Sequence, residues 1–457
     1  MERADLILQR VCPAGGPETR VVVRDGRIAA IGGEGAYAGP EWDARGAHLH
    51  PGLIDHHIHL YATAARMASV DLAGALTADD VVARLRAAPP QADGWVRAIG
   101  YDERTAGLPD ADALSQWLPD APLRMQDRTG ALWILNRAAL AQMGAGPYPT
   151  GVMCDPPGVP TGQIWREDAW LRTRLGASLP DSGALCAQLA GMGVIGVTDA
   201  GASNGPDELA LFAAEIARGA FPLRLCLMGG DHLPEHPLIS RGPLKLLYDE
   251  RDLPDLSLVA SRIRAARAQG RSVAAHCVTL GELLFFLAAL DDAGGGRAGD
   301  RIEHGGIIPA SLFEEVRRHR LTVVTQPDFI RTRGDRYWAE VDPADWSDLY
   351  RLGGLAKAGI PLAAGSDAPY GDLDPWHAIR TAMTRQTVTG VKLGEGESVS
   401  ADAALALYTG AFQAPSQPRT LQVGAPADMI LLDPDWAEQT GNPVQATWIG
   451  GRLCHER

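Results

Sequence analysis

Six residues whose side chains can bind a metal ion are spread along this chain of 457 residues. They are His57, His59, Lys245, His276, His304 and Asp367. Imidazole and carboxylate groups together suit zinc or a similar divalent ion. Three to five such ligands with one coordination position left open are typical of a catalytic metal site. The sequence therefore predicts a catalytic metal site, provided that the fold brings these residues together.

Each of these residues also has a simpler interpretation. An isolated His-x-His pair is a weak signal, because histidines often lie at interfaces as satisfied polar residues. Asp367, in the sequence GSDAP, can equally cap a helix. Lys245 can form an ordinary ion pair with Asp249 or Glu250. The prediction of a metal site therefore depends on whether strands and helices bring all six candidate residues together.

The middle of the chain alternates short apolar strands with amphipathic helical stretches, a pattern typical of repeated βα units around a parallel sheet. The predicted strands cover residues 51–59, 194–199, 222–228, 243–248, 272–277, 301–304, 321–326 and 361–367. Several of the intervening helical stretches close near a glycine that can serve as a C-cap. Eight such units predict an α/β fold, specifically a (β/α)8 TIM barrel.

All six candidate residues fall at or near the carboxyl ends of these strands. They belong to the first strand (His57 and His59), the fourth (Lys245), the fifth (His276), the sixth (His304) and the eighth (Asp367). Active sites of TIM barrels form at the carboxyl ends of the strands. Alternate residues of a strand point the same way, so we expect the His-x-His pair to face the mouth of the barrel and Ile58 to point outward.

The two ends of the chain and one long insertion complete the predicted organisation. Residues 1–50 and 420–457 contain short β-rich runs broken by turns, which predict one small β-sandwich domain built from both termini. Residues 51–419 then form the barrel. Within it, residues 61–192 are rich in Trp, Pro and Gly and follow the first strand, so we interpret them as a lid or substrate-binding insertion over the active face.

The composition and the net charge of the chain argue against some classes of binding partner. A net charge of -14 argues against nucleic acid or an anionic membrane and favours a small-molecule substrate. The longest apolar run, residues 283–290, is too short to cross a bilayer. Six scattered cysteines fit reduced thiols, and the first residues lack the features of a signal peptide, so we predict a cytoplasmic protein. A homodimer is possible.

Four motifs resemble a known family. The sequences GLIDHHIHL, DRIEHGG, AAGSDAP and VGAPADMILLD resemble the amidohydrolase superfamily of metal-dependent hydrolases. The similarity is greatest to the branch that includes formamide deformylase-like and other N-acyl amide hydrolases. It covers nearly the whole chain.

The resemblance implies a (β/α)8 barrel with a β-sandwich and a divalent metal centre of one or two ions, most often zinc. The implied ligands are His57, His59, Lys245, His276, His304 and Asp367. Lys245 falls where similar enzymes carry a carbamylated lysine that bridges two metals. Formation of a carbamate requires a neutral amine, which burial beside cations promotes by lowering the lysine pKa.

The mechanism that follows is hydrolysis of an amide-type C–N bond. A divalent ion lowers the pKa of water toward neutrality and polarises the carbonyl group. Asp367 is expected to accept the proton of that water and to deliver it to the leaving nitrogen.

Four further residues are candidates for substrate binding: Arg331, Arg333, Tyr370 and Trp133. The two arginines follow the seventh strand and can bind a substrate carboxylate, or they can form ion pairs with Asp328 or Asp335. The aromatic residues can line an apolar part of the site.

Two alternative functions stay open. A nucleobase or cyclic amidine deaminase of the same superfamily uses one metal and a glutamate shortly after the histidine of the fifth strand. Here Glu282 comes too late for that pattern. A barrel relative without catalytic activity is expected to lose metal ligands, whereas all of them are present.

Overall fold

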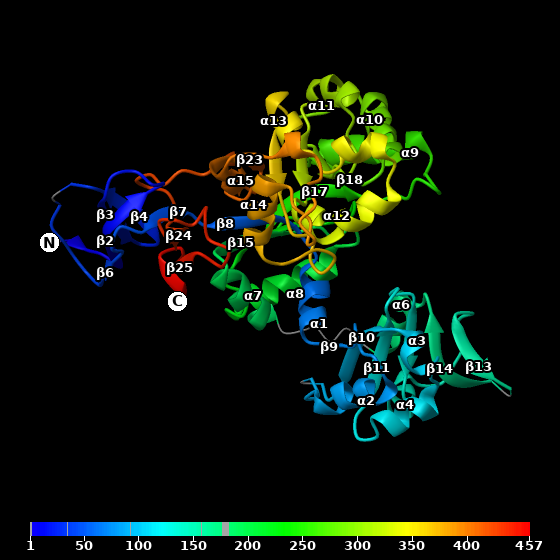
Figure 1. Ribbon diagram of the computed structural model, residues 1–457. Helices are drawn as coiled ribbons and strands as arrows, with labels where there is room; N and C mark the ends of the chain where they lie inside the picture. The colour runs from blue at the N-terminus through cyan, green and yellow to red at the C-terminus, as the bar shows by residue number, and fades with distance from the viewer. Residues whose placement is uncertain (1, 34, 92, 157, 176–181) are drawn as a thin grey trace. The chain divides into compact units, whose positions relative to one another are not determined.

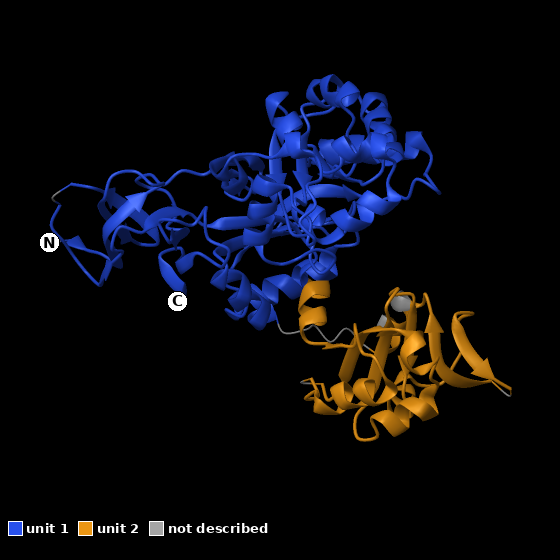
Figure 2. Cartoon of the chain, viewed as in Figure 1, with its two compact units in different colours: residues 1–60, 182–457 blue, residues 61–181 orange. Residues whose placement is uncertain are grey.

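The computed structural model describes residues 2–33, 35–91, 93–156, 158–175 and 182–457. The chain forms two compact units (Figure 2). One consists of Met1–Leu60 with Ser182–Arg457, and the other of Tyr61–Asp181. Figure 1 shows the course of the chain through both.

The larger unit contains a barrel of eight parallel strands. In chain order these are β8 (Leu53–Ile58), β15 (Val194–Asp199), β16 (Arg224–Gly229), β17 (Ser240–Leu246), β18 (Val273–Cys277), β19 (Arg301–His304), β20 (Thr322–Thr325) and β21 (Leu362–Ala364). Each strand pairs with the next one along the chain. The two edges meet through backbone hydrogen bonds from Asp367 to His57 (2.7 Å) and from His59 to Ala368 (2.9 Å). The predicted (β/α)8 barrel is confirmed.

Helices follow the strands around the barrel. They are α7 (Ser182–Gly191), α8 (Pro206–Ala217), α9 (Leu256–Ala268), α10 (Leu280–Asp292), α11 (Phe313–Arg318), α12 (Asp328–Glu340), α13 (Gly353–Lys357), α14 (Pro375–Thr384) and α15 (Ala401–Ala406), with short 3-10 turns at Ala310–Leu312, Pro343–Asp348 and Glu395–Glu397. Local sequence explains where they begin. At α10, Thr279 and Glu282 form a reciprocal capping box, and at α14 Asp374 caps the first turn and Pro375 follows it.

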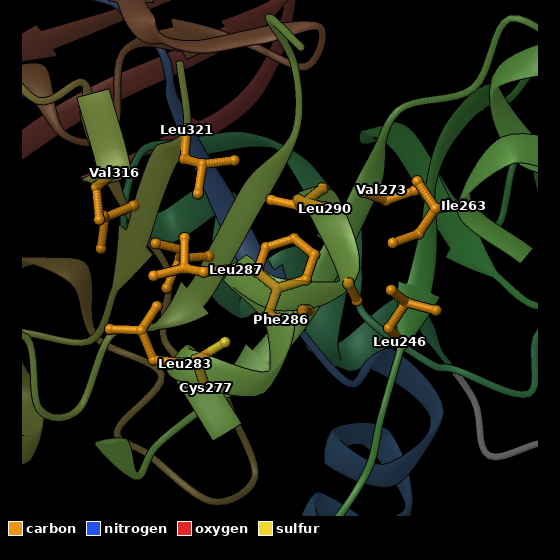
Figure 3. Close-up of a cluster of buried hydrophobic side chains, with 14 of the residues drawn as sticks. Leu246, Ile263, Val273, Cys277, Leu283, Phe286, Leu287, Leu290, Val316 and Leu321 are labelled. Atoms are coloured by element: carbon orange, nitrogen blue, oxygen red, sulfur yellow. The ribbon is translucent and has the colours of Figure 1, made fainter. Parts of the chain in front are cut away.

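Apolar residues at helical spacing attach α10 to the barrel. Leu283, Phe286, Leu287 and Leu290 share one face of the helix and pack with residues of the neighbouring strands and of α9, such as Ile263 (Figure 3). These side chains are almost completely buried. Each contributes about 1.5–3 kcal/mol by leaving water, so this layer holds the strands whose ends carry the candidate site.

The chain termini build a second sheet in the same unit. It runs β26 (Arg452–Glu456), β25 (Val444–Ile449), β24 (Met429–Leu432), β7 (His48–Pro51), β2 (Leu6–Pro13), β3 (Thr19–Arg24) and β4 (Arg27–Ile31), and β6 (Glu41–Asp43) also pairs with β2. Arg10, with a φ of 51°, marks a bulge in β2. Because a bulge bends a strand, β2 can pair with β3 along one part and with β7 along another. The predicted β-sandwich from both termini is confirmed. Two short pairs accompany it, β1 (Glu2–Arg3) with β5 (Tyr37–Ala38) and β22 (Gly410–Ala411) with β23 (Ala414–Pro418).

The smaller unit has its own sheet and cores. Its strands run in the order β13 (Val152–Asp155), β14 (Val159–Trp165), β12 (Leu132–Leu135), β11 (Leu123–Asp127), β10 (Val96–Tyr101) and β9 (Val70–Asp71). Its helices are α1 (Leu60–Met67), α2 (Ala78–Ala87), α3 (Glu103–Ala106), α4 (Ala111–Trp117), α5 (Arg137–Met143) and α6 (Asp168–Leu175). The predicted insertion of residues 61–192 continues into α7, which groups with the barrel unit. Its role as a lid stays a prediction.

Several strand boundaries differ from those predicted by up to three residues, and two of these differences have a clear structural reason. The expected first strand is interrupted at Gly52, where a Cβ atom would lie 2.4 Å from the Ile195 side chain. The expected eighth strand ends at Ala364, because the next residues leave the extended conformation and Asp367 adopts a φ of 54°. None of the helices in the described part of the chain combines the length and the apolar composition that a bilayer span requires.

Candidate metal centre

One cavity of about 360 Å³ opens at the carboxyl ends of the barrel strands. Its walls include all six predicted metal-binding residues: His57, His59, Lys245, His276, His304 and Asp367. The barrel topology therefore gathers side chains separated by up to about 310 positions in the sequence (367 minus 57). This is the arrangement expected of an active site in a TIM barrel.

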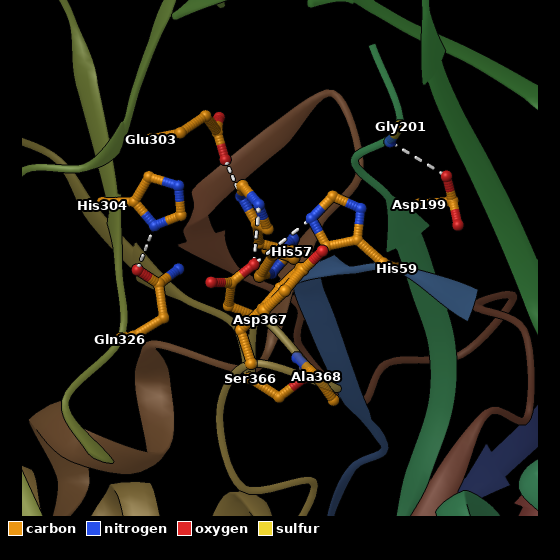
Figure 4. A network of polar contacts seen from close by, with 12 residues as sticks. His57, His59, Asp199, Gly201, Glu303, His304, Gln326, Ser366, Asp367 and Ala368 are labelled. Atoms are coloured by element: carbon orange, nitrogen blue, oxygen red, sulfur yellow. Dashed lines mark hydrogen bonds and ion pairs between the residues drawn. The ribbon is translucent and has the colours of Figure 1, made fainter. Parts of the chain in front are cut away.

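Three of these residues are close enough to share one ion. The Nε2 atoms of His57 and His59 lie 3.4 and 3.3 Å from Oδ1 of Asp367 (Figure 4). One potential ligand atom from each residue lies within 4.8 Å of the others. Asp367 comes from the segment after β21, which the barrel closure places beside the end of β8.

A carboxylate inside the barrel orients His57. Its Nδ1 hydrogen-bonds to Glu303, and Arg301 donates to the same carboxylate from Nε (2.6 Å) and from an η nitrogen (3.0 Å). His57 Nε2 is buried and has no hydrogen-bond partner among the described residues. A histidine that donates one nitrogen to a carboxylate and keeps the other free is the usual form of a metal ligand. The donor set thus fits a divalent ion.

His304 is oriented in a similar way. Its Nδ1 lies 2.7 Å from Oε1 of Gln326, which leaves Nε2 for the cavity. Its ring centroid is 4.6 Å from that of His276 and 4.8 Å from that of His57. The three imidazoles therefore form one cluster.

Backbone strain also gathers at this site. His304 and Asp367 have φ angles of 71° and 54°, in the left-handed region that non-glycine residues rarely adopt. Such strain persists only where surrounding contacts enforce it, and it concentrates at functional sites. For Asp367, the hydrogen bond from its backbone N–H to His57 helps to enforce it.

Burial sets the protonation states of the site. It lowers the pKa of His57 and of His304 well below the ordinary value, and nearby cationic groups add to the effect. Burial raises the pKa of the Asp367 carboxyl, but the hydrogen bond from His59 and the charges of His304 and Lys245 outweigh it, so this pKa is lowered. Neutral imidazoles and an ionised carboxylate are the forms that bind a metal ion.

Lys245 lies near the end of β17 and is only 4% exposed. Burial lowers the pKa of its amine, which favours the neutral form that can react with carbon dioxide. Asp249, one of the partners considered for an ordinary ion pair, binds Arg251 instead.

His276 lines the cavity, whereas Glu282 binds the backbone at the start of a helix. The Glu282 carboxylate accepts hydrogen bonds from the backbone N–H groups of Val278 (2.8 Å) and Thr279 (3.1 Å) at the start of α10. Its distance from His276 Nε2 is 4.0 Å. Glu282 is thus a helix cap, which disfavours the acid–base role that a deaminase would give it.

The four candidate substrate-binding residues lie in different surroundings. Arg333 and Tyr370 line the cavity. Arg331 is paired with Asp328 and Asp372. Trp133 lies in β12 of the smaller unit, where it is buried.

The remaining histidines of the first motif lie elsewhere. His48 and His50 belong to β7 of the terminal sheet. His56 is fully buried in β8. Asp55 accepts hydrogen bonds from the backbone N–H groups of His57 and Ser366, both 3.0 Å, so it helps to position two segments that carry candidate ligands.

Sequence reasoning did not assign roles to Glu303, Arg301 and Gln326. A signal was available for Glu303 and Arg301, because RIEH places two charged residues at alternate positions of a predicted barrel strand. Charged groups pointing into a barrel interior must be paired. Gln326 carried no comparable signal.

A second group of metal-capable side chains, Asp291, Glu315 and His319, lies on and just after α10 and α11. Arg318 donates hydrogen bonds to both of its carboxylates. Arg318 therefore offsets one of the two negative charges of this group.

Comparison with known proteins identifies the family. The model of the amidohydrolase family matches residues 41–455. This chain belongs to the amidohydrolase family. It is therefore a metal-dependent hydrolase of C–N bonds, with a divalent metal ion and a small-molecule substrate.

This amidohydrolase is similar to several known proteins over nearly its whole length. It is 26% identical to the N-substituted formamide deformylase of Arthrobacter pascens, covering 96% of this chain and 95% of the relative. It is 25% identical to the putative amidohydrolase YtcJ of Bacillus subtilis, with 96% of both chains covered. An uncharacterized metal-dependent hydrolase from Pyrococcus horikoshii has the same fold, with a TM-score of 0.78 at 19% identity and coverage of 96% and 99%.

Proposed function

We propose that this amidohydrolase cleaves the C–N bond of N-substituted formamides or related N-acyl amines that carry a carboxylate. The observation that supports this most is the single cavity lined by four histidines, a buried lysine and Asp367. The similarity to a relative named N-substituted formamide deformylase points to the same substrate class.

In this proposal the ligands divide into two groups. His57, His59 and Asp367 would hold one zinc ion, and His276 and His304 would hold a second. Lys245 would take part as a carbamate. When bound, a divalent ion supplies water of lowered pKa and polarises the scissile carbonyl. The buried Nε2 of His57, which has no hydrogen-bond partner among the described residues, and the burial of Lys245 support these assignments.

Asp367 carries the proton. Its lowered pKa keeps the carboxylate ionised, so it can accept a proton from the attacking water. As the new C–O bond forms and the C–N bond breaks, the same carboxyl returns this proton to the leaving nitrogen. The products are a carboxylic acid and an amine, so atoms and charges balance.

The cavity walls suggest what surrounds the scissile bond. Leu247, Val278 and Phe329 provide apolar surface. Arg333 places its guanidinium 3.6 Å from the centre of the Phe329 ring and donates to the backbone carbonyl of Tyr370 (2.8 Å). Because Arg331 is already bound to two aspartates, we assign recognition of a substrate carboxylate to Arg333.

The test is a substrate panel with controlled metal content. Purified protein is assayed with N-benzylformamide, N-formyl and N-acetyl amino acids, and guanine and cytosine, before and after dialysis against a chelator. We expect metal-dependent release of amine from the amides. Release of ammonia from the nucleobases alone would identify a deaminase, and the absence of turnover with zinc, manganese or iron would favour a barrel without catalytic activity.

Arg333 is tested by comparing charged and neutral substrates. Arg333→Met should raise KM for an N-formyl amino acid about 10- to 100-fold, the value of one or two charge-assisted hydrogen bonds, and leave KM for its amide-capped analogue unchanged. Arg336→Met is the control, because Arg336 lies on the same helix with its side chain 66% exposed. Equal effects on both substrates would contradict carboxylate recognition.

We also propose that Lys245 is carbamylated. A carbamate should appear as density beyond Nζ of Lys245 in a crystal structure and should be absent from Lys245→Met, with loss of bound metal. The six cysteines, all present as free thiols, support a cytoplasmic enzyme. A homodimer stays a prediction that light scattering can test.

A further inference from the structure

A second cavity of about 690 Å³ opens at the other end of the barrel strands. Ser240 and Arg301, the first residues of β17 and β19, line it. Lys245 and His304, near the far ends of the same two strands, line the catalytic cavity. The two cavities are therefore separated by the length of the barrel strands.

The lining of this second cavity is strongly basic. Five arginines and two acidic residues contribute to it: Arg241, Arg267, Arg271, Arg297, Arg301, Glu235 and Asp300. The chain as a whole carries a net charge of -14. A positive concave surface on such a protein attracts anions.

Two of the five arginines have acidic partners in the wall. Arg241 lies 2.9 Å from Glu235, whose side chain is 78% exposed. Arg267 lies 2.8 Å from Asp300, which is fully buried. The first of these pairs is exposed enough to open, whereas the second belongs to the structure.

Arg271 is a buried cation with no carboxylate partner among the described residues. Its guanidinium donates to four backbone carbonyls, at 2.8 Å to Gly230 and at 3.1–3.3 Å to Pro243, Gly229 and Gly242. Burial, together with the positive charge of Arg241, lowers its pKa to about 10. An anion in the cavity would offset both effects.

Arg301 provides an unused donor in the same wall. Its side chain is 2% exposed, and its Nη1 has no hydrogen-bond partner among the described residues. The other two nitrogens bind Glu303 and the carbonyl of His56. A buried guanidinium nitrogen without a partner is costly unless a ligand satisfies it.

We propose that this cavity binds a small organic anion, whose carboxylate or phosphate group is held by Arg241, Arg271 and Arg301. The volume is typical of small-molecule sites. Leu238, Ile239 and Phe412 add apolar surface for the rest of the ligand.

Side-chain contacts connect this second cavity to the catalytic cavity at the other end of the barrel. Arg301 binds Glu303, and Glu303 binds His57. An anion that contacts Arg301 is thus linked to the catalytic cavity by direct contacts inside the barrel. The link runs through the side chains of Arg301, Glu303 and His57.

Isothermal titration of the metal-loaded protein with phenyl phosphate and with benzoate tests the proposal. The two ligands share a ring and differ in the anionic group, so the tighter one identifies the preferred oxyanion. The catalytic cavity is itself proposed to hold a carboxylate, so the relevant binding is the part that persists in Arg333→Met. We expect that part to be saturable, with one molecule per chain. Arg241→Gln should weaken it at least tenfold, and Glu235→Gln, which frees Arg241 from its partner, should tighten it.

Two controls locate the binding. Arg262→Gln removes an arginine of α9 that pairs with Asp231 at 2.9 Å in the same manner, and it should leave the Kd unchanged. Arg333→Met should also leave it unchanged, because Arg333 lines the catalytic cavity. Absence of saturable binding, equal weakening by Arg241→Gln and Arg262→Gln, or loss of binding in Arg333→Met would overturn the proposal.

Discussion

At the scale of single residues, Asp367 combines two properties that rarely occur together. It is a buried carboxylate with a lowered pKa, and its backbone is strained. Metal binding and proton transfer both use the ionised form.

Asp367→Asn should therefore lower kcat by about 10²–10⁴, the usual contribution of a positioned acid or base. The amide is similar in size, so the thermal midpoint should change little. Steady-state kinetics and elemental analysis measure the two effects. Full activity in the variant with metal retained would exclude Asp367 as the proton carrier.

His50 in β7 gives a prediction about stability and pH. Burial lowers its pKa from 6.5 to about 4, with His48 lowering it further and Asp402 opposing the shift. Because the unfolded chain takes up this proton first, stability should fall as the pH drops from 7 toward 4.

Protonation of His50 in the unfolded chain should lower the free energy of unfolding by roughly 2 kcal/mol between pH 7 and pH 5. In the His50→Leu variant, the free energy of unfolding should fall correspondingly less between pH 7 and pH 5. Urea unfolding at the two pH values measures this difference. An identical loss in the wild-type protein and the variant would show that His50 does not contribute.

At the scale of elements, β19 supports the catalytic site from inside the barrel. Arg301 and Glu303 point inward from alternate positions, and Glu303 fixes the ring of His57. Partners of this kind determine which imidazole nitrogen faces the ion.

Glu303→Gln should lower metal affinity or activity about 10- to 100-fold. Competition with a chelator dye measures the affinity, and circular dichroism checks the fold. Glu314→Gln, with its side chain 82% exposed on α11, is the control. Unchanged metal affinity in Glu303→Gln would mean that this glutamate only neutralises Arg301.

Helix α10 offers a matched pair of leucines. Leu283 is fully buried against the barrel, and its neighbour Leu284 is 47% exposed. Leu283→Ala should destabilise the protein by about 2–5 kcal/mol, from lost burial and the cavity that remains. Leu284→Ala should change stability by less than about 0.5 kcal/mol. Chemical denaturation compares them, and similar values would contradict the packing seen in Figure 3.

At the scale of the whole molecule, the metal centre joins distant parts of the barrel. The proposed ligands come from the ends of β8, β17, β18 and β19 and from the segment after β21. An ion that binds only the folded state stabilises it by mass action, by about 2.7 kcal/mol at a free concentration of 100 times the Kd.

Dialysis against a chelator should therefore abolish activity and lower the thermal midpoint, and added zinc should restore both. Differential scanning calorimetry measures the midpoint. The same midpoint with and without metal would show that the ligands do not depend on an ion for their arrangement.

The sequence by itself predicted the barrel and the terminal sandwich, which the structure confirms, and it singled out six candidate residues that line one cavity. This was possible because strand periodicity places residues at strand ends, and in a TIM barrel those ends meet. The family motifs around His57, His304 and Asp367 pointed to the same positions.

Only the tertiary structure decided how these residues are held and what else the barrel contains. The pairing of Arg331 with Asp372, 41 positions further along the chain, does not follow from spacing. The basic cavity at the opposite end arises where the starts of several strands meet a loop and a helix end. Such features depend on contacts between segments far apart in the chain, and local sequence patterns carry no information about those contacts.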